Sequence, residues 1–450
     1  MENTNRDDIV LLFDFFNMGS QDLLASFQNA DFDIDAVVIN DDGFLPDSVE
    51  NVYEYFINGE EGAKEGKPLF FNQIEVPEYW EIRGTNSNGS VYDKTRERAR
   101  IFYAEPKHKR LVKVVDWISE DGNVRASDHY NKYGRLYART IFNKKAQRVS
   151  KSYFNSLGQE IIVENFVTGD IILNDGDAIR FFKNKTEFVV FYFKRKGLDH
   201  KRIFFNSLST PFFVSNALPA YDNKKGDVLF WQEPTHQEIP GNMLLILDGN
   251  APRCDKVVVQ NHQSYDRLLQ LNANEAKMEE LGFIYSFKKK NMGRRSALIC
   301  TNTENVEKLK ELAEALPEVK FHVAALTEMS AKLMAHEKYE NVVMYPNVKM
   351  SVLDKLFWDC DFYLDINHEG EIVEATRRAF LHNQIILCFN ETAHGLTYTA
   401  TENRFTASDY RKMVYRIKGL LKEKDKLTTA VYSQQRYALT ATVEDYQRLR

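Results

Sequence analysis

The sequence has only four cysteines, and they lie far apart: Cys254, Cys300, Cys360 and Cys388. No CxxC motif and no Cys/His cluster occurs. A structural zinc site needs such a cluster of thiolate and imidazole ligands, so the spacing argues against one. Three of the cysteines lie in or beside apolar stretches, which is typical of reduced thiols packed in a core. We therefore expect no metal and no other cofactor.

Long hydrophobic runs are also missing. No apolar run approaches the ~18–20 residues that a membrane-spanning helix needs. The first residues include Glu2, Asp7 and Asp8, and no basic stretch of the kind that opens a signal peptide precedes an apolar run. These absences predict a protein that stays in the cytoplasm.

Common phosphate-binding and catalytic motifs are absent as well. The sequence contains no GxGxxG, no GxxxxGK[ST], no GxSxG and no HExxH. The turn after the first predicted strand, Asp14–Ser20, holds a single glycine, Gly19. The usual phosphate cradles, hydrolase nucleophiles and metalloprotease ligands are therefore not provided.

Aromatic residues, in contrast, are abundant: 31 Phe and 22 Tyr stand against 11 Pro. This favours long β stretches or wide buried interfaces over disorder. Between about Tyr79 and Phe182, short alternating runs are separated by turn signals such as Asn88-Gly89, Asp121-Gly122 and Leu157-Gly158. The clearest predicted strands are Leu111–Trp117, Leu136–Phe142, Glu160–Phe166 and Ile171–Asn174. The pattern predicts an antiparallel β-meander.

This predicted meander is the first candidate for a protein interface. An open meander has two faces and two edges, and long exposed edges invite pairing with another chain. Several aromatic residues alternate along its strands and form the candidate interface. They are Tyr92, Phe102, Tyr130, Tyr133, Tyr137, Tyr153 and Phe154.

The segments on either side of the meander show strand–helix alternation. Before it, the strands 9–16 and 34–39 flank a helix at 22–30; after it come a helix at 185–195 and strands at 202–205, 228–231, 243–247 and 257–260. From residue 283 strands and helices alternate regularly up to a last helix at 409–424. We predict an α/β protein with two Rossmann-like domains and an inserted meander. The predicted domains are 1–75 with 183–275, 76–182, and 276–450.

Charge is unevenly distributed along the chain. Residues 1–93 carry 4 Lys/Arg and 20 Asp/Glu, residues 94–151 carry 16 and 6, and the remainder carries 39 of each sign. The basic block can face the acidic segment within the fold, or it can face a protein partner, and we favour these two interpretations. Binding of nucleic acid or anionic lipid by residues 94–151 remains an alternative.

One cluster has acid/base character. His368, Glu369, Glu371 and Glu374 follow the predicted strand 362–366, and Asn302 follows the strand 296–301. The carboxyl ends of parallel strands are where ligands bind, so these residues are candidates for a cleft between the two α/β domains. Acidic residues at the start of a helix explain the pattern equally well.

In the turn 302–305, Glu304 would repel a diphosphate, so we expect Thr303 or Asn302 to cap a helix at about Val306. A catalytic role of the acid/base cluster stays open at this point.

Several segments together resemble a known family. They are Glu78–Ile82, Gly84–Asn86, Tyr103–Pro106, Lys109–Val112, Asp128–Asn131, Glu164–Asp170 and Asn206–Phe213. The sequence resembles the GT-B glycosyltransferases that modify serine-rich repeat adhesins. It is most similar to their partner subunits, the GtfB-type glycosyltransferase-stabilising proteins of the accessory Sec system. The resemblance implies a GT-B-like fold.

The departures from active enzymes agree with a partner role. Retaining enzymes of this fold usually carry an Arg and a Lys after the first strand of the C-terminal half, where this chain has Asn302–Asn305 and, further on, Lys308. Glu374-Ala375 matches the second half of the paired-glutamate motif, but Ile366 stands where the first glutamate would be. The resemblance therefore implies a non-catalytic subunit.

As the resemblance implies, this chain binds a GtfA-type catalytic subunit through the meander, with two copies of each. The catalytic subunit transfers N-acetylglucosamine from UDP-GlcNAc, while this chain holds the Ser/Thr-rich adhesin near His368, Glu369, Glu371, Glu374 and Asn302. It also implies peripheral association with the cytoplasmic face of the membrane. The alternative is an active GT-B enzyme that uses a nucleotide sugar, with Arg294, Arg295 or Glu374 completing its site.

Overall fold

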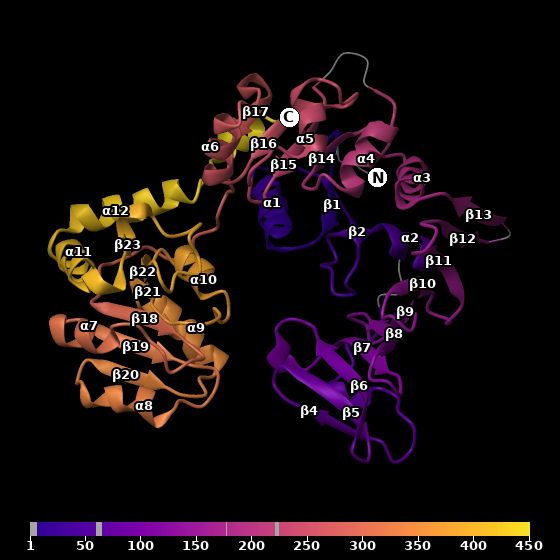
Figure 1. Cartoon of the computed structure of the whole chain (residues 1–450). Coiled ribbons are helices and arrows are strands. Elements are labelled where there is room, and N and C mark those ends of the chain that lie inside the picture. Colours follow the sequence, from indigo (N-terminus) through magenta and orange to yellow (C-terminus); the bar gives the residue numbers. More distant parts are fainter. Residues whose placement is uncertain (1–6, 60–64, 177, 221–224) are drawn as a thin grey trace. The chain divides into compact units, whose positions relative to one another are not determined.

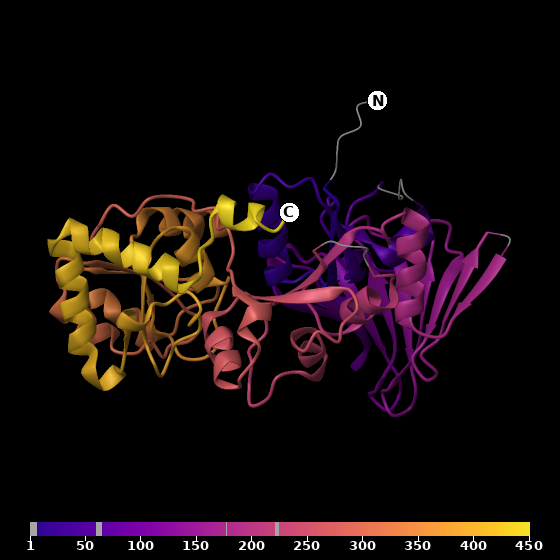
Figure 2. The same ribbon diagram turned by 90° about the horizontal axis from the view of Figure 1, so that it is seen from above.

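A computed structural model describes residues 7–59, 65–176, 178–220 and 225–450. The chain divides into two units (Figures 1 and 2). Unit 1 comprises residues 1–232, 237–258 and 269–279, and unit 2 comprises 233–236, 259–268 and 280–450. Unit 1 contains a seven-stranded sheet and a ten-stranded antiparallel sheet, and unit 2 contains a six-stranded parallel sheet. The predicted α/β class with an inserted meander is confirmed.

The seven-stranded sheet has the order β17-β16-β15-β14-β1-β2-β3. Its strands are β1 (Ile9–Phe15), β2 (Asp35–Asn40), β3 (Glu50–Asn51), β14 (Arg202–Phe205), β15 (Asp227–Trp231), β16 (Cys254–Val259) and β17 (Met278–Glu280). The helices are α1 (Met18–Asn29), α2 (Val52–Asn58), α3 (Lys185–Lys196), α4 (Thr210–Ala217), α5 (Gly241–Leu247) and α6 (His262–Gln270). β1 pairs in parallel with β2 and β14, so strands from both sides of the meander share one sheet.

The predicted strand at 243–247 is wrong, because these residues form α5. A five-residue apolar run fits a strand and a helix equally well by periodicity. In the structure Met243, Ile246 and Leu247 are buried while Leu244 and Leu245 are exposed, which is the spacing of one helix face. The helix begins directly after Pro240, which fits a proline beside a helix start.

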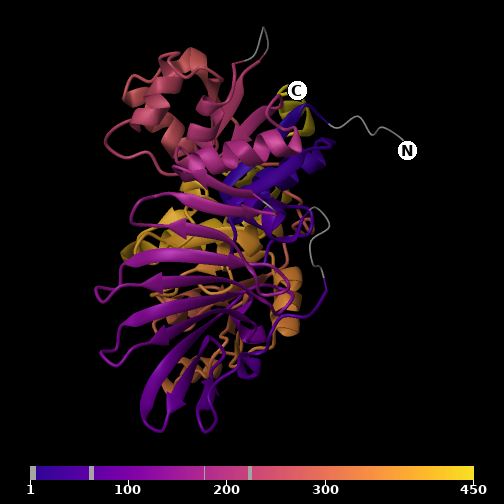
Figure 3. The same cartoon turned by 90° about the vertical axis from the view of Figure 1, so that its right-hand side faces the viewer.

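The meander is a ten-stranded sheet whose strands lie side by side in sequence order (Figure 3). They are β4 (Glu81–Gly84), β5 (Asn88–Asp93), β6 (Arg96–Tyr103), β7 (Val112–Ile118), β8 (Val124–Tyr130), β9 (Leu136–Phe142), β10 (Arg148–Phe154), β11 (Glu160–Asn165), β12 (Ile171–Asp175) and β13 (Ala178–Phe182). Gly122 and Gly158 have positive φ in the predicted turns. The turn predicted at Asn88-Gly89 is wrong, because both residues lie in β5.

Different segments of the chain cover the two faces of the meander, one face at each end of the sheet. On one face, Val115 and Ile101 are fully buried under residues 69–80. On the opposite face, Leu173, Ile162 and Tyr153 are buried at the other end of the sheet, where α2 and α3 pack against it (Figure 1). Each end of the sheet therefore has one covered and one uncovered face.

The six-stranded sheet has the order β20-β19-β18-β21-β22-β23. Its strands are β18 (Ser296–Cys300), β19 (Lys320–Ala324), β20 (Val342–Tyr345), β21 (Phe362–Asp365), β22 (Ile385–Phe389) and β23 (Arg404–Phe405). The helices are α7 (Leu309–Ala315), α8 (Ala331–Met334), α9 (Met350–Asp359), α10 (Ala375–Leu381), α11 (Tyr410–Lys422), α12 (Lys424–Tyr437) and α13 (Val443–Gln447). The helix predicted at 409–424 is thus followed by two more, because Glu423 interrupts one helical pattern.

No helix within the described residues is both long enough and apolar enough to cross a membrane.

Candidate functional site

The acidic N-terminal segment and the basic block of the meander face each other inside unit 1. Lys113 Nζ lies 2.6 Å from Asp42 Oδ2, and Lys132 Nζ lies 2.6 Å from Asp47 Oδ1. For these pairs the within-fold interpretation of the charge pattern is confirmed. Both pairs are solvent-exposed, and they join segments some 70 to 90 residues apart, so they link the meander to the sheet that carries it.

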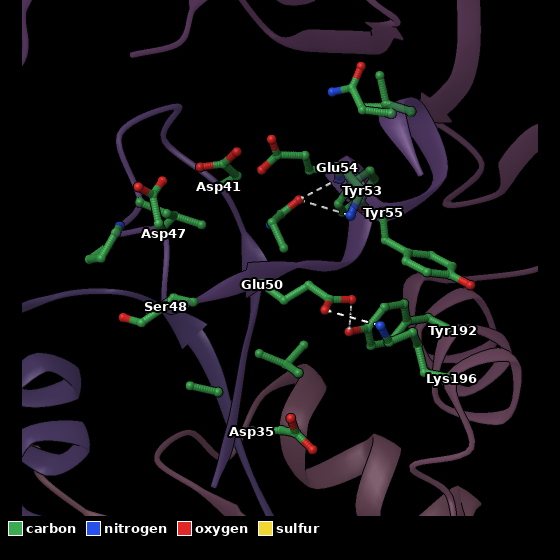
Figure 4. A pocket seen from close by; sticks show the side chains of 18 of the residues that line it. Asp35, Asp41, Asp47, Ser48, Glu50, Tyr53, Glu54, Tyr55, Tyr192 and Lys196 are labelled. Atoms are coloured by element: carbon green, nitrogen blue, oxygen red, sulfur yellow. Dashed lines mark hydrogen bonds and ion pairs between the residues drawn. The ribbon is translucent and has the colours of Figure 1, made fainter. Parts of the chain in front are cut away.

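A groove of about 610 Å³ follows this contact between the acidic segment and the meander (Figure 4). One of its carboxylates, Glu50, accepts a hydrogen bond from the Tyr192 hydroxyl at 2.6 Å and pairs with Lys196 at 3.3 Å. Burial raises the pKa of Asp41 to about 7, and the negative charge of Glu54 acts in the same direction. The three lysines of the described lining, Lys132, Lys196 and Lys201, each pair with a carboxylate, so these residues provide no free cation for an anion.

Two of the predicted interface tyrosines, Tyr153 and Tyr137, are buried and do not lie on an open surface of the meander. The rings of Tyr53 on α2 and Tyr153 on β10 stack at 4.4 Å. Both hydroxyls point to Glu164 Oε2, at 3.4 and 3.5 Å, and Lys185 Nζ lies 2.9 Å from the other oxygen of that carboxylate. Tyr137 is also buried, with 8% of its surface exposed.

The remaining predicted interface residues are more accessible. Phe102 is 45% exposed, and Tyr92, Tyr130, Tyr133 and Phe154 are half-buried. Their contact with a partner stays a prediction.

Sequence reasoning missed a more exposed apolar strip on β11–β13. Phe181 pairs with Ile172, and Ile172 pairs with Val163, so the three side chains share one face. Phe181 is 64% exposed and Ile179, two residues before it, is 78% exposed. The alternation of Ile179 and Phe181 after the turn at Gly176 was the available signal. We call Val163, Ile172, Ile179 and Phe181 the apolar strip.

The structure brings part of the acid/base cluster together at the carboxyl edge of the six-stranded sheet. The loop after β18 pairs with the loop after β21, and the His368 N–H donates to the Asn305 carbonyl oxygen at 2.9 Å. His368 Nε2 lies 2.9 Å from Glu307 Oε2, and Thr303 Oγ1 donates to Glu369 Oε1 at 3.3 Å. Asn302 is exposed in the same loop.

The expected helix cap at Thr303 or Asn302 is wrong. α7 begins only at Leu309, and the Thr303 hydroxyl instead accepts the Asn305 N–H at 3.2 Å. The pairing of Val306 with Asn367 holds this segment extended and delays the helix. The helix after β21 also begins late, at Ala375.

Glu371 and Glu374 occupy the start of α10. Glu371 Oε1 accepts hydrogen bonds from the N–H and the hydroxyl of Thr376, both at 2.6 Å. Glu374 is exposed and precedes the first residue of the helix with a φ of 51°. Glu371 therefore stabilises the start of α10, which agrees with the alternative that acidic residues here belong to a helix start.

A diphosphate would find no unpaired lysine or arginine on the described loops after β18 and β21. Lys308 Nζ lies 3.6 Å from both Glu307 and Glu311, and Lys332 lies 3.3 Å from Glu304. Arg294, a candidate for an active enzyme, pairs with Asp361 before β21, at the opposite edge of the sheet. Binding a nucleotide sugar needs charge compensation, and these loops are dominated by carboxylates.

His394 holds two loops together at the same edge. The ring atom Nδ1 of His394 lies 2.6 Å from Asp365 Oδ1, and its Nε2 contacts the Glu369 carbonyl oxygen. The backbone N–H of His394 donates to Asp365 Oδ2 at 2.6 Å. The hydrogen bond to Asp365 raises the pKa of His394 to about 9. A protonated ring donates from both nitrogens, so it clamps the loop after β22 to the loop after β21.

The carboxyl edge of the seven-stranded sheet carries a second polar group that sequence reasoning did not single out as a site. Asn206, directly after β14, donates to Ser20 Oγ at 2.9 Å and to Gln232 Oε1 at 3.2 Å. Its own Oδ1 has no partner in the described chain, although only 8% of the residue is exposed.

The neighbours of Asn206 are polar too. Ser207 Oγ donates to Asp14 Oδ2 at 3.3 Å, and burial raises the pKa of Asp14. A Cβ on Gly19 would come within 2.4 Å of Gln232 Oε1, so this single glycine lets Gln232 approach the start of α1. The edge offers acceptors for an O–H or N–H group.

Family models match the chain along most of its length. Residues 10–56 match the GtfB N-terminal domain, 80–183 the GtfB middle domain, 185–271 the GtfB third domain, and 297–434 the GftB/GlyA-F C-terminal domain.

Similar proteins of known name or structure cover nearly the whole chain. The UDP-N-acetylglucosamine–peptide N-acetylglucosaminyltransferase stabilizing protein GtfB of Streptococcus agalactiae is 42% identical over 95% of this chain and 98% of its own. The protein of the same name from Streptococcus gordonii is 40% identical over 98% and 97%.

Among solved structures, a chain of a GtfA/B complex bound to UDP and GlcNAc has a TM-score of 0.91 at 39% identity, over 98% of both chains. Staphylococcus aureus TarM, 14% identical over 98% of both chains with a TM-score of 0.54, shares the GT-B-like fold alone.

The clamp at His394 predicts a pH-dependent stability. Because the folded pKa of about 9 lies above the ordinary 6.5, the protonated ring stabilises the fold below about pH 6.5, and this stabilisation is lost as the pH rises through 9. We expect the thermal midpoint of His394→Gln to lie below that of the wild type at pH 6 and to approach it at pH 9.5. A constant difference across this range would contradict the assignment.

Proposed function

Because the chain belongs to the GtfB family of glycosyltransferase-stabilising proteins, we propose that it is a non-catalytic subunit of a protein O-GlcNAc-transferase complex. It binds a GtfA-type glycosyltransferase and supports transfer of N-acetylglucosamine by that partner. The names of its relatives and the solved GtfA/B complex support this proposal. So does the lack of charge compensation for a diphosphate on the loops after β18 and β21.

The observation that carries the partner role is the apolar strip. Phe181 and Ile179 expose 64% and 78% of their surfaces on a sheet whose opposite face is buried under α2 and α3. Large exposed apolar patches on a folded protein mark interaction sites. A meander of the catalytic partner is the occupant that we propose.

We also propose that the chain holds the Ser/Thr-rich polypeptide of a serine-rich repeat adhesin. The unpartnered Asn206 Oδ1 supports this role, because it lacks the hydrogen-bond donor that a serine or threonine hydroxyl or a peptide N–H supplies. His368, Glu369, Glu371, Glu374 and Asn302 stay candidate acceptor contacts at the other sheet edge.

We propose that the chain has three domains: residues 1–75 with 183–275, residues 76–182, and residues 276–450. The ten-stranded sheet (β4–β13) lies within 76–182 and the six-stranded sheet (β18–β23) within 276–450, which supports this division, whereas β17 of the seven-stranded sheet lies just beyond the boundary at 275.

A transfer assay tests the function directly. Purified chain, UDP-GlcNAc and a Ser/Thr-rich repeat peptide are incubated with and without a GtfA-type subunit, and incorporated sugar is measured by mass spectrometry. We expect transfer only when both proteins are present, and faster than with the GtfA-type subunit alone. Transfer by this chain alone would overturn the non-catalytic role.

The partner role predicts that the apolar strip controls complex formation. Phe181→Asp places a charge in the proposed interface, and we expect at least a tenfold rise in the Kd for the GtfA-type subunit, or about 1.4 kcal/mol. Leu157→Asp is the matched control, because Leu157 is an apolar residue, 80% exposed, in the turn between β10 and β11 and outside the apolar strip. Calorimetric titration measures both, and equal effects of the two substitutions would exclude the strip.

The acceptor role predicts that Asn206 contributes to peptide binding. Asn206→Leu removes the buried acceptor oxygen, and we expect about tenfold weaker binding of the repeat peptide, as for the loss of one buried hydrogen bond. Asn216→Leu removes another unpartnered buried amide oxygen, on α4, and should leave binding unchanged. Fluorescence anisotropy reports the affinity, and thermal midpoints verify that both variants fold. Unchanged binding in Asn206→Leu would remove this edge from the proposal.

A further inference from the structure

The groove between the acidic segment and the meander lies within unit 1 and has no part in the proposed function. Its volume of about 610 Å³ falls in the range of about 300–1,000 Å³ that is typical of small-molecule sites. The lining residues come from 33–59, from 192–201 around the end of α3, and from 131–137 of the meander. A ligand in the groove can therefore contact both the meander and the sheet that carries it.

Negative charge dominates the lining of the groove. Six carboxylates stand against three lysines, so the lining has a net charge of −3 when all of these groups are ionised. The six carboxylates are those of Asp33, Asp35, Asp41, Asp47, Glu50 and Glu54. Each of the three lysines pairs with one carboxylate of the lining. The excess of negative charge favours a cation in the groove and repels an anion.

At Asp41, directly after β2, the chain supplies no cation in ion-pair contact. Among the described residues, the Asp41 carboxylate accepts only the Gly43 N–H, at 2.7 Å, and forms no ion pair. Figure 4 shows the carboxylates of Asp41 and Glu54 turned toward each other. Burial raises the pKa of Asp41 to about 7, with the negative charges of Glu54 and Asp42 acting in the same direction and Lys151 on β10 opposing them.

Tyrosine rings of the lining already attract ammonium groups. Lys132 Nζ lies 5.4 Å from the centre of the Tyr133 ring, and Lys196 Nζ lies 5.2 Å from the centre of the Tyr55 ring. The face of an aromatic ring carries negative charge density, so it stabilises a cation placed over it. The groove thus combines excess carboxylates with ring faces, which is the chemistry that recognises organic cations.

We propose that this groove binds an organic cation, an alkylammonium or guanidinium group, with Asp41 and Glu54 as its carboxylate partners. Such a group donates several N–H bonds at once, so it can bridge two carboxylates that face each other, and its alkyl stem can pack against tyrosine. In the described parts of the chain, no group of three or more His, Cys, Asp or Glu is placed to hold a metal ion. This inference does not depend on the proposed function.

Protonation of Asp41 opposes this binding. With a pKa of about 7, the Asp41 carboxyl is about one-tenth ionised at pH 6 and about nine-tenths ionised at pH 8. The cation binds the ionised form, so the Kd is expected to be about tenfold lower at pH 8 than at pH 6.

Calorimetric titration of the full chain tests the inference with two probes. Spermidine represents a free polyamine, and the peptide acetyl-Gly-Arg-Gly-amide represents a basic side chain of a polypeptide. We expect at least one of them to bind at pH 8 at least tenfold more tightly than the uncharged acetyl-Gly-Gln-Gly-amide, and the tighter of the two identifies the source of the cation. Asp41→Asn should weaken this binding at least tenfold at pH 8 and abolish its pH dependence.

Two further variants separate the groove from general charge effects. Asp248→Asn is the matched control, because Asp248 is an exposed carboxylate of unit 1 outside the groove lining, and it should bind within twofold of the wild type. Glu54→Gln removes a like charge beside Asp41, so it should weaken binding and also move the pH dependence to lower pH. Thermal midpoints establish that all three variants are folded.

Three results would overturn the assignment. The first is that neither probe binds more tightly than the uncharged peptide. The second is an equal loss of binding in Asp41→Asn and Asp248→Asn. The third is displacement of the bound probe by magnesium chloride but not by sodium chloride of the same ionic strength, which would make the groove a metal site.

Discussion

An open sheet of ten strands has more surface than this chain can cover, and that constraint shapes unit 1. Residues 69–80 cover one face at one end, and α2 and α3 cover the other face at the other end. Successive side chains of a strand point to opposite faces of the sheet, so a different segment of the chain can cover each face. What remains uncovered is apolar at Phe181 and Ile179, where a second protein has something to bury.

In unit 2, by contrast, the loops at the carboxyl edge of the six-stranded sheet are held together by contacts within the chain. Its carboxyl edge, where a nucleotide-sugar enzyme would keep cations for its donor, is closed by loops that bond to each other through His394, Asp365 and Thr303. Carboxylates there serve helix starts and loop clamps. The sheet thus shares a fold with glycosyltransferases, while its carboxyl edge is held closed by contacts between its own loops.

Periodicity predicted most of this architecture, and its failures have physical reasons. The parallel strands and the meander follow from alternation and turn glycines. Gly89, however, lies within a strand, and there glycine is explained by the Tyr103 hydroxyl, which would lie 2.9 Å from a Cβ. The run 243–247 is too short to distinguish helix from strand. Burial of Tyr153 depends on α2 and burial of Tyr137 on Asp41 and Gly43, and no local pattern encodes these contacts with the meander. The unpartnered oxygen of Asn206 arises only from three-dimensional packing.

The joint around Glu164 has a consequence for exchanging parts between related proteins. Tyr53 comes from the N-terminal segment, Lys185 from the helix after the meander, and Tyr153 with Glu164 from the meander itself. A graft that moved only the ten strands would bury a carboxylate beside foreign neighbours. A graft of the meander should therefore include residues 41–58 and α3, although these segments are separate in the sequence.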